Sequence, residues 1–180
     1  HDMETQIAYI KQSYPQYQNI TEDEVIKVQK DIFIKQIKLA SRMNLPIVVH
    51  SRDATQDTLE IIKEYADILP KKGLVHCFSG STEIAREYFK LGFYISVGGS
   101  VTFKNARNIP EVLRQCGIAN VMLETDCPYL CPEPYRGQIN EPKNVVLVND
   151  KIADLLDMDY KEVEEITTAN AHKLFGRLPC

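Results

Sequence analysis

The sequence predicts an α/β fold built on a parallel sheet, and three observations support that prediction. Short β-branched runs alternate with longer segments whose apolar residues recur at helical spacing, which is typical of βαβ units. Strand ends recur at a regular interval, because 26 residues separate His50 from His76 and 29 separate Val97 from Asp126. A (β/α)8 TIM barrel spends roughly 30 residues on each unit and about 250 in all. The 180 residues, with four clear strands, therefore predict a TIM barrel that is incomplete on its N-terminal side.

The first predicted helix begins at Thr21, which forms a capping-box pattern with Glu24, and its apolar residues recur up to Met43. Pro46 prevents any further helix, and the β-branched run 47–49 that follows is typical of a strand buried on both faces. The remaining elements repeat this alternation, with helices at 54–66, 82–91, 110–116, 144–156 and 161–175 and strands at 74–75, 93–97 and 121–123.

Turn and capping residues mark the boundaries of these elements. Asp159 is the expected N-cap of the last helix, with Glu162 at the capping-box position.

A long loop with several prolines, 127–142, follows the last strand, and loops of this length are often functional. No repeat or change of composition divides the chain, so residues 1–180 are expected to form one domain. Glycine follows three of the predicted helices, at Gly92, Gly117 and Gly176.

The composition excludes several classes of protein. The mean hydropathy is −0.26, no window approaches the ~20 apolar residues of a membrane span, and no charged-then-apolar leader is visible. The net charge of −4 is not that of a dedicated nucleic-acid binder, although an enzyme that grips phosphates locally is compatible with it. The five cysteines show no C-x-x-C spacing, so we expect neither a disulfide scaffold nor a structural zinc site, and a reducing, cytoplasmic location is favoured.

Metal-ligand residue types follow three of the predicted strands. His50 follows the first strand, His76 follows the second, and Glu124 and Asp126 follow the last. Because the carboxyl ends of parallel strands open onto one face of a barrel, these side chains are expected to converge there. Neutral imidazole and carboxylate suit zinc or manganese, and carboxylate-rich surroundings admit magnesium. The pattern therefore predicts a divalent-metal site.

A structural role for these histidines stays open, because a single histidine at a strand end is more often a hydrogen-bonded structural residue than a ligand. Two of the four histidines lie at equivalent strand ends, and an acidic residue lies at a third strand end. This pattern gives the structural role and the metal-ligand role equal weight. His172 is expected on a helix surface, and His1 lies at a terminus. Ser51 and Arg52 emerge beside His50, where a guanidinium is placed to bind phosphate; a surface ion pair with Asp53 is an equally good interpretation.

Taken together, several motifs resemble the TatD-type metal-dependent deoxyribonucleases. The resemblance runs without a break from about Thr21 to Phe175, and the joint occurrence of the motifs is far more specific than any one of them. The motifs are Val-Val-His50-Ser-Arg-Asp-Ala, His76-Cys-Phe-Ser-Gly-Ser, Ser96-Val-Gly-Gly, Leu-Glu124-Thr-Asp126-Cys-Pro-Tyr-Leu, Arg136-Gly, Asn140-Glu-Pro and the terminal Asn170-Ala and Leu174-Phe.

The resemblance implies a TIM-barrel hydrolase that uses divalent metal ions (magnesium, manganese or zinc, two in the complete site) to cleave DNA phosphodiesters. It implies His50, His76 and Asp126 as metal ligands. Asp126 would also act catalytically, as acceptor of a proton from the attacking water, with Glu124 supporting the site. The implied partner is DNA, single-stranded or at its ends. The residues expected to bind this substrate are Ser51, Arg52, Arg136, Asn140 and Glu141.

Two elements of the family pattern do not occur in this sequence: an opening strand with His-x-His, and a later strand with the glutamate of Gly-Glu-x-Gly-Leu-Asp. His1-Asp2 resembles the end of the segment before the second family helix, which would then be residues 4–18, yet Asn19 runs directly into Ile20. We expect an N-terminal truncation and a discontinuity near residues 19–20, or a sequence that contains only ordered residues. Part of the expected metal cage is then missing.

Three functions stay open on this basis. The leading one is a divalent-metal-dependent hydrolase that cleaves DNA phosphodiester bonds. The second is a hydrolase of the same fold that acts on D-aminoacyl-tRNA or another ester, with the metal polarising a carbonyl. The third is a non-catalytic remnant that binds nucleic acid or a partner, which the absent His-x-His and glutamate strands favour.

Overall fold

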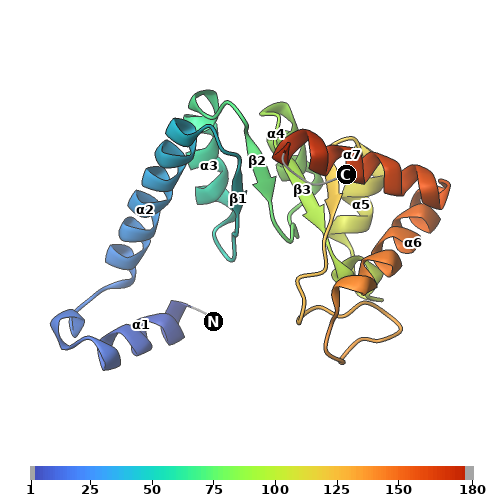
Figure 1. Cartoon of the computed structure of the whole chain (residues 1–180). Helices are drawn as coiled ribbons and strands as arrows, with labels where there is room; N and C mark the ends of the chain where they lie inside the picture. The colour runs from blue at the N-terminus through green and yellow to red at the C-terminus, as the bar shows by residue number, and fades with distance from the viewer. Residues whose placement is uncertain (1–2, 177–180) are drawn as a thin grey trace.

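The computed structural model describes residues 3–176, in which a parallel sheet is flanked by helices (Figure 1). Its four strands lie side by side in chain order: β1 (Ile47–Val49), β2 (Gly73–Val75), β3 (Tyr94–Val97) and β4 (Val121–Leu123). Each crossover between them carries a helix: α3 (Thr55–Tyr65), α4 (Thr82–Lys90) and α5 (Asn108–Cys116). The predicted α/β fold with four parallel strands is confirmed, and sequential parallel strands are the arrangement found in part of a TIM barrel.

The remaining helices lie at the two ends of the sheet. In Figure 1, α1 (Met3–Ser13) and α2 (Glu22–Met43) extend away on the β1 side, while α6 (Val145–Leu156) and α7 (Tyr160–Phe175) gather on the β4 side. Short 3-10 helices connect the larger elements at η1 (Pro15–Tyr17), η2 (Ala66–Ile68), η3 (Gly99–Thr102) and η4 (Pro142–Asn144). The segment 4–18, expected as one helix, is divided into α1 and η1 before Pro15, whose ring does not fit a helix interior.

Capping residues explain where the helices begin. At the start of α2, the Thr21 hydroxyl accepts from the Glu24 amide, and the Glu24 carboxylate accepts from the Thr21 amide at 2.9 Å, so the predicted capping box is confirmed. At the start of α7, Asp159 is the N-cap as predicted, but its carboxylate accepts from the Lys161 amide, one residue before the expected partner Glu162.

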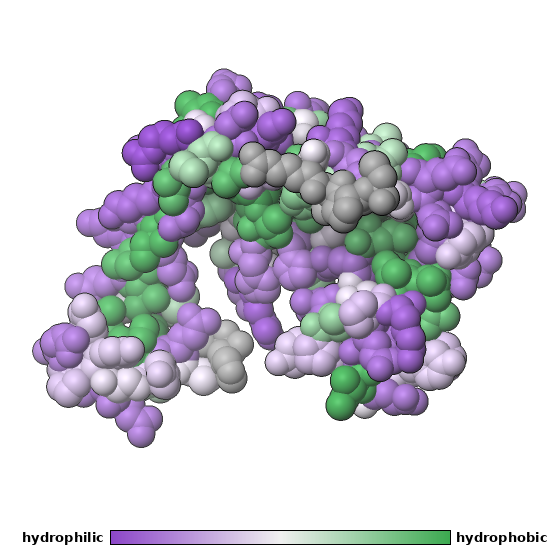
Figure 2. All heavy atoms as spheres, viewed as in Figure 1, coloured by the Kyte–Doolittle hydropathy of each residue, from purple (hydrophilic) through white to green (hydrophobic). Residues whose placement is uncertain are grey.

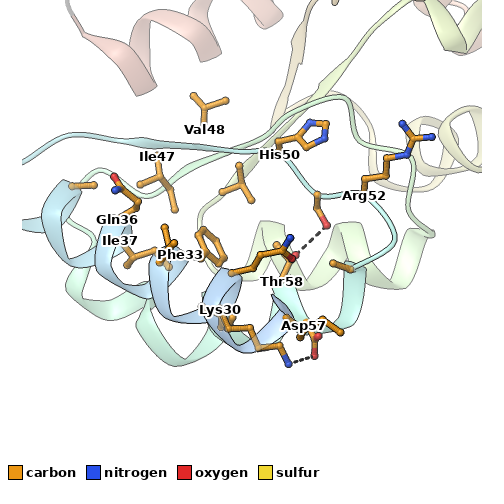
Figure 3. A pocket seen from close by; sticks show the side chains of 18 of the residues that line it. Lys30, Phe33, Gln36, Ile37, Ile47, Val48, His50, Arg52, Asp57 and Thr58 are labelled. Carbon is orange, nitrogen blue, oxygen red and sulfur yellow. Dashed lines mark hydrogen bonds and ion pairs between the residues drawn. The ribbon is translucent and has the colours of Figure 1, made fainter. Parts of the chain in front are cut away.

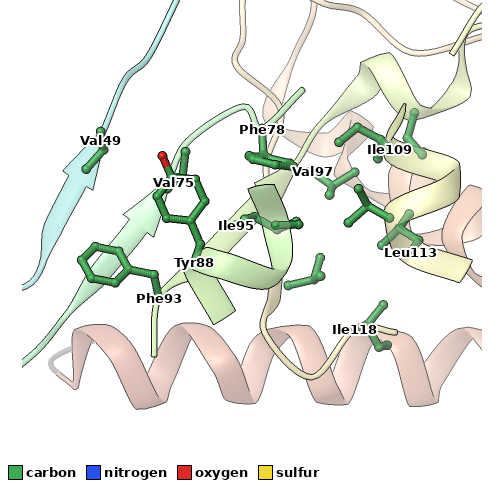
Figure 4. Packing of buried hydrophobic residues seen from close by; sticks show 14 of the residues in the cluster. Val49, Val75, Phe78, Tyr88, Phe93, Ile95, Val97, Ile109, Leu113 and Ile118 are labelled. Atoms are coloured by element: carbon green, nitrogen blue, oxygen red, sulfur yellow. The ribbon is translucent and has the colours of Figure 1, made fainter. Parts of the chain in front are cut away.

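The sheet separates two hydrophobic clusters. On one face, side chains of β1 to β4 pack with the helices of the crossovers and with α6 in the larger cluster, which includes Phe93, Ile95 and Val97 (Figure 4). On the other face, Leu74, Tyr94 and Met122 pack against Leu174 of α7. Burial on both faces explains why β2, β3 and β4 have nearly continuous apolar sequences.

The expectation that run 47–49 is buried on both faces is wrong for one of its residues. Val49 is buried, but Val48, which faces the other side of the strand, is 57% exposed. In the described part of the chain, β1 pairs only with β2, and α7 covers the inner face at the opposite end of the sheet. The apolar, β-branched sequence of residues 47–49 is therefore enough to form the strand, but it does not determine which element covers each face of it.

Some expectations concern absences or residues at the termini. Between residues 3 and 176, no helix is both long enough and apolar enough to span a bilayer. The four cysteines in that range, Cys77, Cys116, Cys127 and Cys131, carry free thiols. Expectations about His1, Asp2 and Cys180 fall outside the described residues.

Candidate metal centre

The ends of β1, β2 and β4 bring the predicted ligands to one edge of the sheet. The register pairs Val49 with Val75, so the next residues, His50 and His76, are neighbours, and their ring centroids lie 5.8 Å apart. The amide of His76 donates to the carbonyl of Val49, which ties the two strand ends together. The predicted convergence of strand ends therefore holds for both histidines.

His76 is held between the two acidic residues that follow β4. Its Nδ1 lies 2.6 Å from Oε2 of Glu124, and its Nε2 lies 3.5 Å from Oδ1 of Asp126. Two ligand atoms of one tetrahedral zinc ion, each about 2.1 Å from the metal, are separated by about 3.4 Å. The separation between His76 Nε2 and Asp126 Oδ1 is therefore that of two atoms which can share one metal ion.

Glu124 supports this arrangement. Its Oε2 accepts from His76 and also from the hydroxyl of Ser96, at 2.8 Å. A carboxylate that accepts from one ring nitrogen of a histidine leaves the other nitrogen available to a metal, and such partners orient ligands in many metal sites. The second oxygen, Oε1, is buried and has no hydrogen-bond partner within the described residues. That oxygen, which has no hydrogen-bond partner, is a further potential metal ligand at the same strand end.

Two backbone positions in this cluster have positive φ. Cys77, directly after His76, has φ of 48°, and Asp126 has φ of 52°. Residues other than glycine adopt this region rarely and at an energetic cost, and such positions concentrate at functional sites. Burial is the main factor that raises the pKa of the Cys77 thiol to about 12, followed by the charges of Glu124 and Asp126. Cys77 therefore stays protonated and is no candidate nucleophile.

The donor set fits a divalent cation in kind, because imidazole and carboxylate groups are ligands of zinc and manganese. Between residues 3 and 176, no three histidine, cysteine or acidic side chains are grouped closely enough to hold a metal ion as they stand. His76, Glu124 and Asp126 are brought together, whereas His50 is an exposed neighbour. The structure thus groups three potential donor side chains at one edge of the sheet, with His50 beside them.

Ser51 and Arg52, expected to bind substrate, lie just past β1 at the end of a cavity of about 980 Å³ between α2, β1 and α3 (Figure 3). The hydroxyl of Ser51 is within 3.0 Å of the Thr58 hydroxyl, so it ties the loop after β1 to α3. Arg52 is exposed and forms the expected surface ion pair with Asp53, whose carboxylate lies 3.9 Å from Nε, too far for a hydrogen bond.

Asn140 organises the long loop rather than facing solvent, for it is only 3% exposed. Its amide nitrogen donates to the carbonyls of Thr125 and Tyr129, both at 2.7 Å. Its oxygen accepts from the Glu141 amide and from Asn144, both at 2.9 Å. These four bonds use every donor and acceptor position of the side chain, so Asn140 shapes the loop next to Asp126 and has none left for substrate.

The other two loop candidates are also engaged with neighbours. The guanidinium of Arg136 lies 4.1 Å from the centroid of the Phe103 ring, a cation–π contact that joins the loop to the segment after η3. Glu141 forms an exposed ion pair with Lys143. Both side chains remain partly exposed at the surface of the loop.

Ser96 and Asn170 occur in the sequence motifs, but the sequence by itself indicates no role for either residue. Ser96 contacts Glu124, and the amide of Asn170 donates to the carbonyls of Ile118 and Val121 at 3.1 and 2.8 Å. The signal for Ser96 was present, since a lone hydroxyl in an otherwise apolar buried strand needs a partner. No local signal indicates the partners of Asn170, which lie about 50 positions earlier in the chain.

A parallel α/β sheet whose strand ends carry histidine and carboxylate groups at metal-sharing distance is the architecture of the barrel hydrolases that use divalent metals. The sequence profile described as "TatD related DNase" matches residues 15–176. The chain belongs to this family.

Relatives of known sequence or structure agree with that membership. "Uncharacterized metal-dependent hydrolase YabD" of Bacillus subtilis is 48% identical over 82% of this chain and 58% of its own length. A mouse protein named "Putative deoxyribonuclease TATDN3" is 33% identical over 87% of this chain and 51% of its own. The crystal structure of YJJV, a TatD homologue of Escherichia coli, superposes with a TM-score of 0.80 at 30% identity, covering 89% of this chain and 61% of that one. The chain thus spans between half and about three fifths of these relatives.

Proposed function

We propose that this chain belongs to a divalent-metal-dependent hydrolase that cleaves DNA phosphodiester bonds. The observation that supports this most directly is the position of His76, whose Nε2 is turned to Asp126 while its Nδ1 is held by Glu124. The family name and the name of the mouse relative support DNA as the substrate. The negative net charge of the chain favours local contacts with phosphate over a broad basic surface.

Each residue of the site has a proposed part in the reaction. His76 and Asp126 would hold the metal, with His50 as a further ligand from the end of β1. When bound, a divalent metal supplies Lewis-acid polarisation of a phosphoryl oxygen and activates water near neutral pH. Asp126, whose side chain is one-third exposed, would accept the proton of the attacking water. Arg52, exposed and only loosely paired with Asp53, would exchange that partner for a non-bridging phosphate oxygen, which a planar guanidinium recognises well.

The test is cleavage of an end-labelled single strand and of the matching duplex, each with magnesium, manganese or zinc, and with EDTA as the metal-free reference. We expect metal-dependent cleavage by the wild-type chain. His76→Ala and Asp126→Asn should each reduce the rate by about 10² or more, because each removes a metal ligand. The Asp126 variant also removes the proton acceptor.

The matched control is Asp150→Asn, an exposed residue of α6, which makes the same chemical change away from the cluster. It should retain the wild-type rate. Full activity in His76→Ala and Asp126→Asn would refute the site. Turnover of D-aminoacyl-tRNA without cleavage of DNA would replace the phosphodiester by a carboxylic ester as the substrate. Absence of both activities, together with absence of bound metal, would identify a non-catalytic remnant.

A further inference from the structure

Ser96 is a buried hydroxyl in the middle of the sheet. It lies in β3, is 1% exposed, and is flanked in sequence by the buried residues Ile95 and Val97. Placing a hydroxyl in such an environment costs free energy unless hydrogen bonds compensate, so its partners explain why it is there. Both of its partners belong to the candidate metal centre: the amide of Cys77 donates to Ser96 Oγ at 3.1 Å, and Ser96 Oγ donates to Glu124 Oε2 at 2.8 Å.

The direction of these bonds is determined by the chemistry of the groups. A backbone amide can only donate, so the bond from Cys77 occupies an acceptor position of the hydroxyl. The hydroxyl proton of Ser96 is then directed to the carboxylate of Glu124. A chain of two hydrogen bonds therefore runs from Cys77, after β2, through Ser96 in β3, to Glu124, which follows β4.

The carboxylate of Glu124 depends on Ser96 for its orientation. Its Oε2 accepts from Ser96 and His76, while Oε1 has no hydrogen-bond partner among residues 3–176. Gly98 lies against the same side chain, because a Cβ at that position would be 3.4 Å from Cγ of Glu124. Ser96 is the hydroxyl donor to Glu124, beside His76 and the thiol of Cys77, which is a much weaker donor.

We propose that Ser96 is a positioning residue of the metal centre: its hydroxyl holds the Glu124 carboxylate so that His76 keeps Nδ1 on Glu124 and presents Nε2 beside Asp126. This inference rests on the proposed metal site and does not depend on the substrate. Without the hydroxyl, Glu124 keeps its bond to His76 and the weak thiol donor of Cys77, so Glu124 and His76 can rotate as a pair. Nε2 then loses its fixed position relative to Asp126, and the two ligands must be ordered when the metal binds.

The first measurement needs no metal. Long-range proton–nitrogen NMR of the metal-free chain with labelled histidine, at one pH near 8, reports which ring nitrogen of His76 carries the proton. The wild type should show a single form with the proton on Nδ1. Ser96→Ala should show a mixture of the two tautomers, whereas Ser96→Thr, which keeps the hydroxyl, should restore the wild-type spectrum.

The second measurement is the affinity for zinc, by competition with a chromogenic chelator. We expect Ser96→Ala to weaken binding by about 10- to 100-fold, the usual effect of removing a group that orients a ligand. Thr167→Val is the matched control, since Thr167 is also a buried hydroxyl, but it donates at 2.8 Å to the Val163 carbonyl within α7. Its loss should lower thermal stability without changing the His76 spectrum or the zinc affinity.

The outcomes separate this inference from the proposed function. A Ser96→Ala chain with the wild-type tautomer and a zinc affinity within twofold of wild type would overturn the role of Ser96 and leave the metal site standing. An equal loss in Thr167→Val would reduce the effect to stability and overturn it as well. If the wild-type chain binds no divalent metal, the proposed site fails, while the metal-free spectra still decide whether Ser96 orients His76 through Glu124.

Discussion

The two ends of the sheet differ sharply. At the β4 end, the Asn170 amide satisfies the carbonyls of Ile118 and Val121, and α7 packs over the inner face. At the β1 end, Val48 is exposed, and α2 turns a stripe of apolar side chains to solvent (Figure 2). The stripe comprises Val28, Ile32, Leu39 and Met43. Strands of similar sequence thus end up in opposite environments, because coverage depends on elements elsewhere in the chain.

The same difference extends to the candidate ligands. His76 lies between two strands and is held by Glu124, which Ser96 holds in turn. His50 follows the edge strand and is exposed. A ligand on the closed side is already oriented for a metal, whereas the ligand on the open side has no comparable support among the described residues. Preorganisation in this chain follows burial, because β2 and β3 are buried at every residue, whereas β1 has one buried residue, Val49.

The largest expected effect contrasts the core of the sheet with its open end by truncation. Phe93, fully buried beside Tyr88 in the larger cluster, should lose about 3–5 kcal/mol of unfolding free energy when changed to alanine (Figure 4). Ile32→Ala, at a half-exposed position of α2, should change it by no more than about 0.5 kcal/mol. Urea denaturation measures both. A loss at Ile32 as large as that at Phe93 would show that the open side is covered in solution.

A smaller effect tests what closes the β4 end. Asn170→Ala leaves two buried carbonyls without their donor and should cost about 1–3 kcal/mol of unfolding free energy. Asn105→Ala, an exposed asparagine after η3, is the control and should be neutral. The same denaturation experiment applies. A neutral Asn170→Ala would mean that packing of α7, rather than its amide, closes this edge.

The next effect belongs to the open side. Thr21→Ala removes the capping box of α2 and should cost about 1 kcal/mol, while Thr21→Ser keeps the capping oxygen and should cost little. Amide hydrogen exchange is the sensitive measurement here, because the loss should appear in the first turns of α2 and leave β3 and β4 unchanged. Faster exchange throughout the sheet would show that α2 and the closed side unfold as one unit.

The smallest expected effect is a pH dependence where α3 meets α4. Hydrogen bonds from Lys63 and Lys90, at 2.5 and 2.6 Å, lower the pKa of Glu87 from 4.5 to about 2. A lowered folded-state pKa adds stability that is present above pH 4.5 and is lost as the pH falls toward 2. Because Glu87 and its two lysine partners are largely accessible to solvent, their contribution to stability is small and is screened by salt.

Glu87→Gln removes that contribution. The difference in thermal midpoint between wild type and variant should be present at neutral pH, shrink below pH 4.5, and decrease with added salt. Glu164→Gln, an exposed change in α7, should show no such trend. A difference that grows as the pH falls would contradict the assigned pKa shift.

Much of the secondary structure could be predicted because its causes are local. The capping box at Thr21, the block at Pro46 and the β-branched runs each act over a few residues, and the helices and strands appear where these signals place them. The candidate ligands His50, His76 and Asp126 could be proposed because parallel strands bring their carboxyl ends to one edge. That prediction needs only the order of the strands.

The sequence alone thus determined which segments become helix and strand, which residues follow the strand ends, and the family to which those motifs point. The tertiary structure alone decided that Val48 is exposed, that Asn140 holds a loop, and that Ser96 supports Glu124. The physical reason is distance along the chain. His76 and Glu124 are 48 positions apart and Asn170 lies 49 positions from Val121, so these contacts exist only once the sheet has assembled.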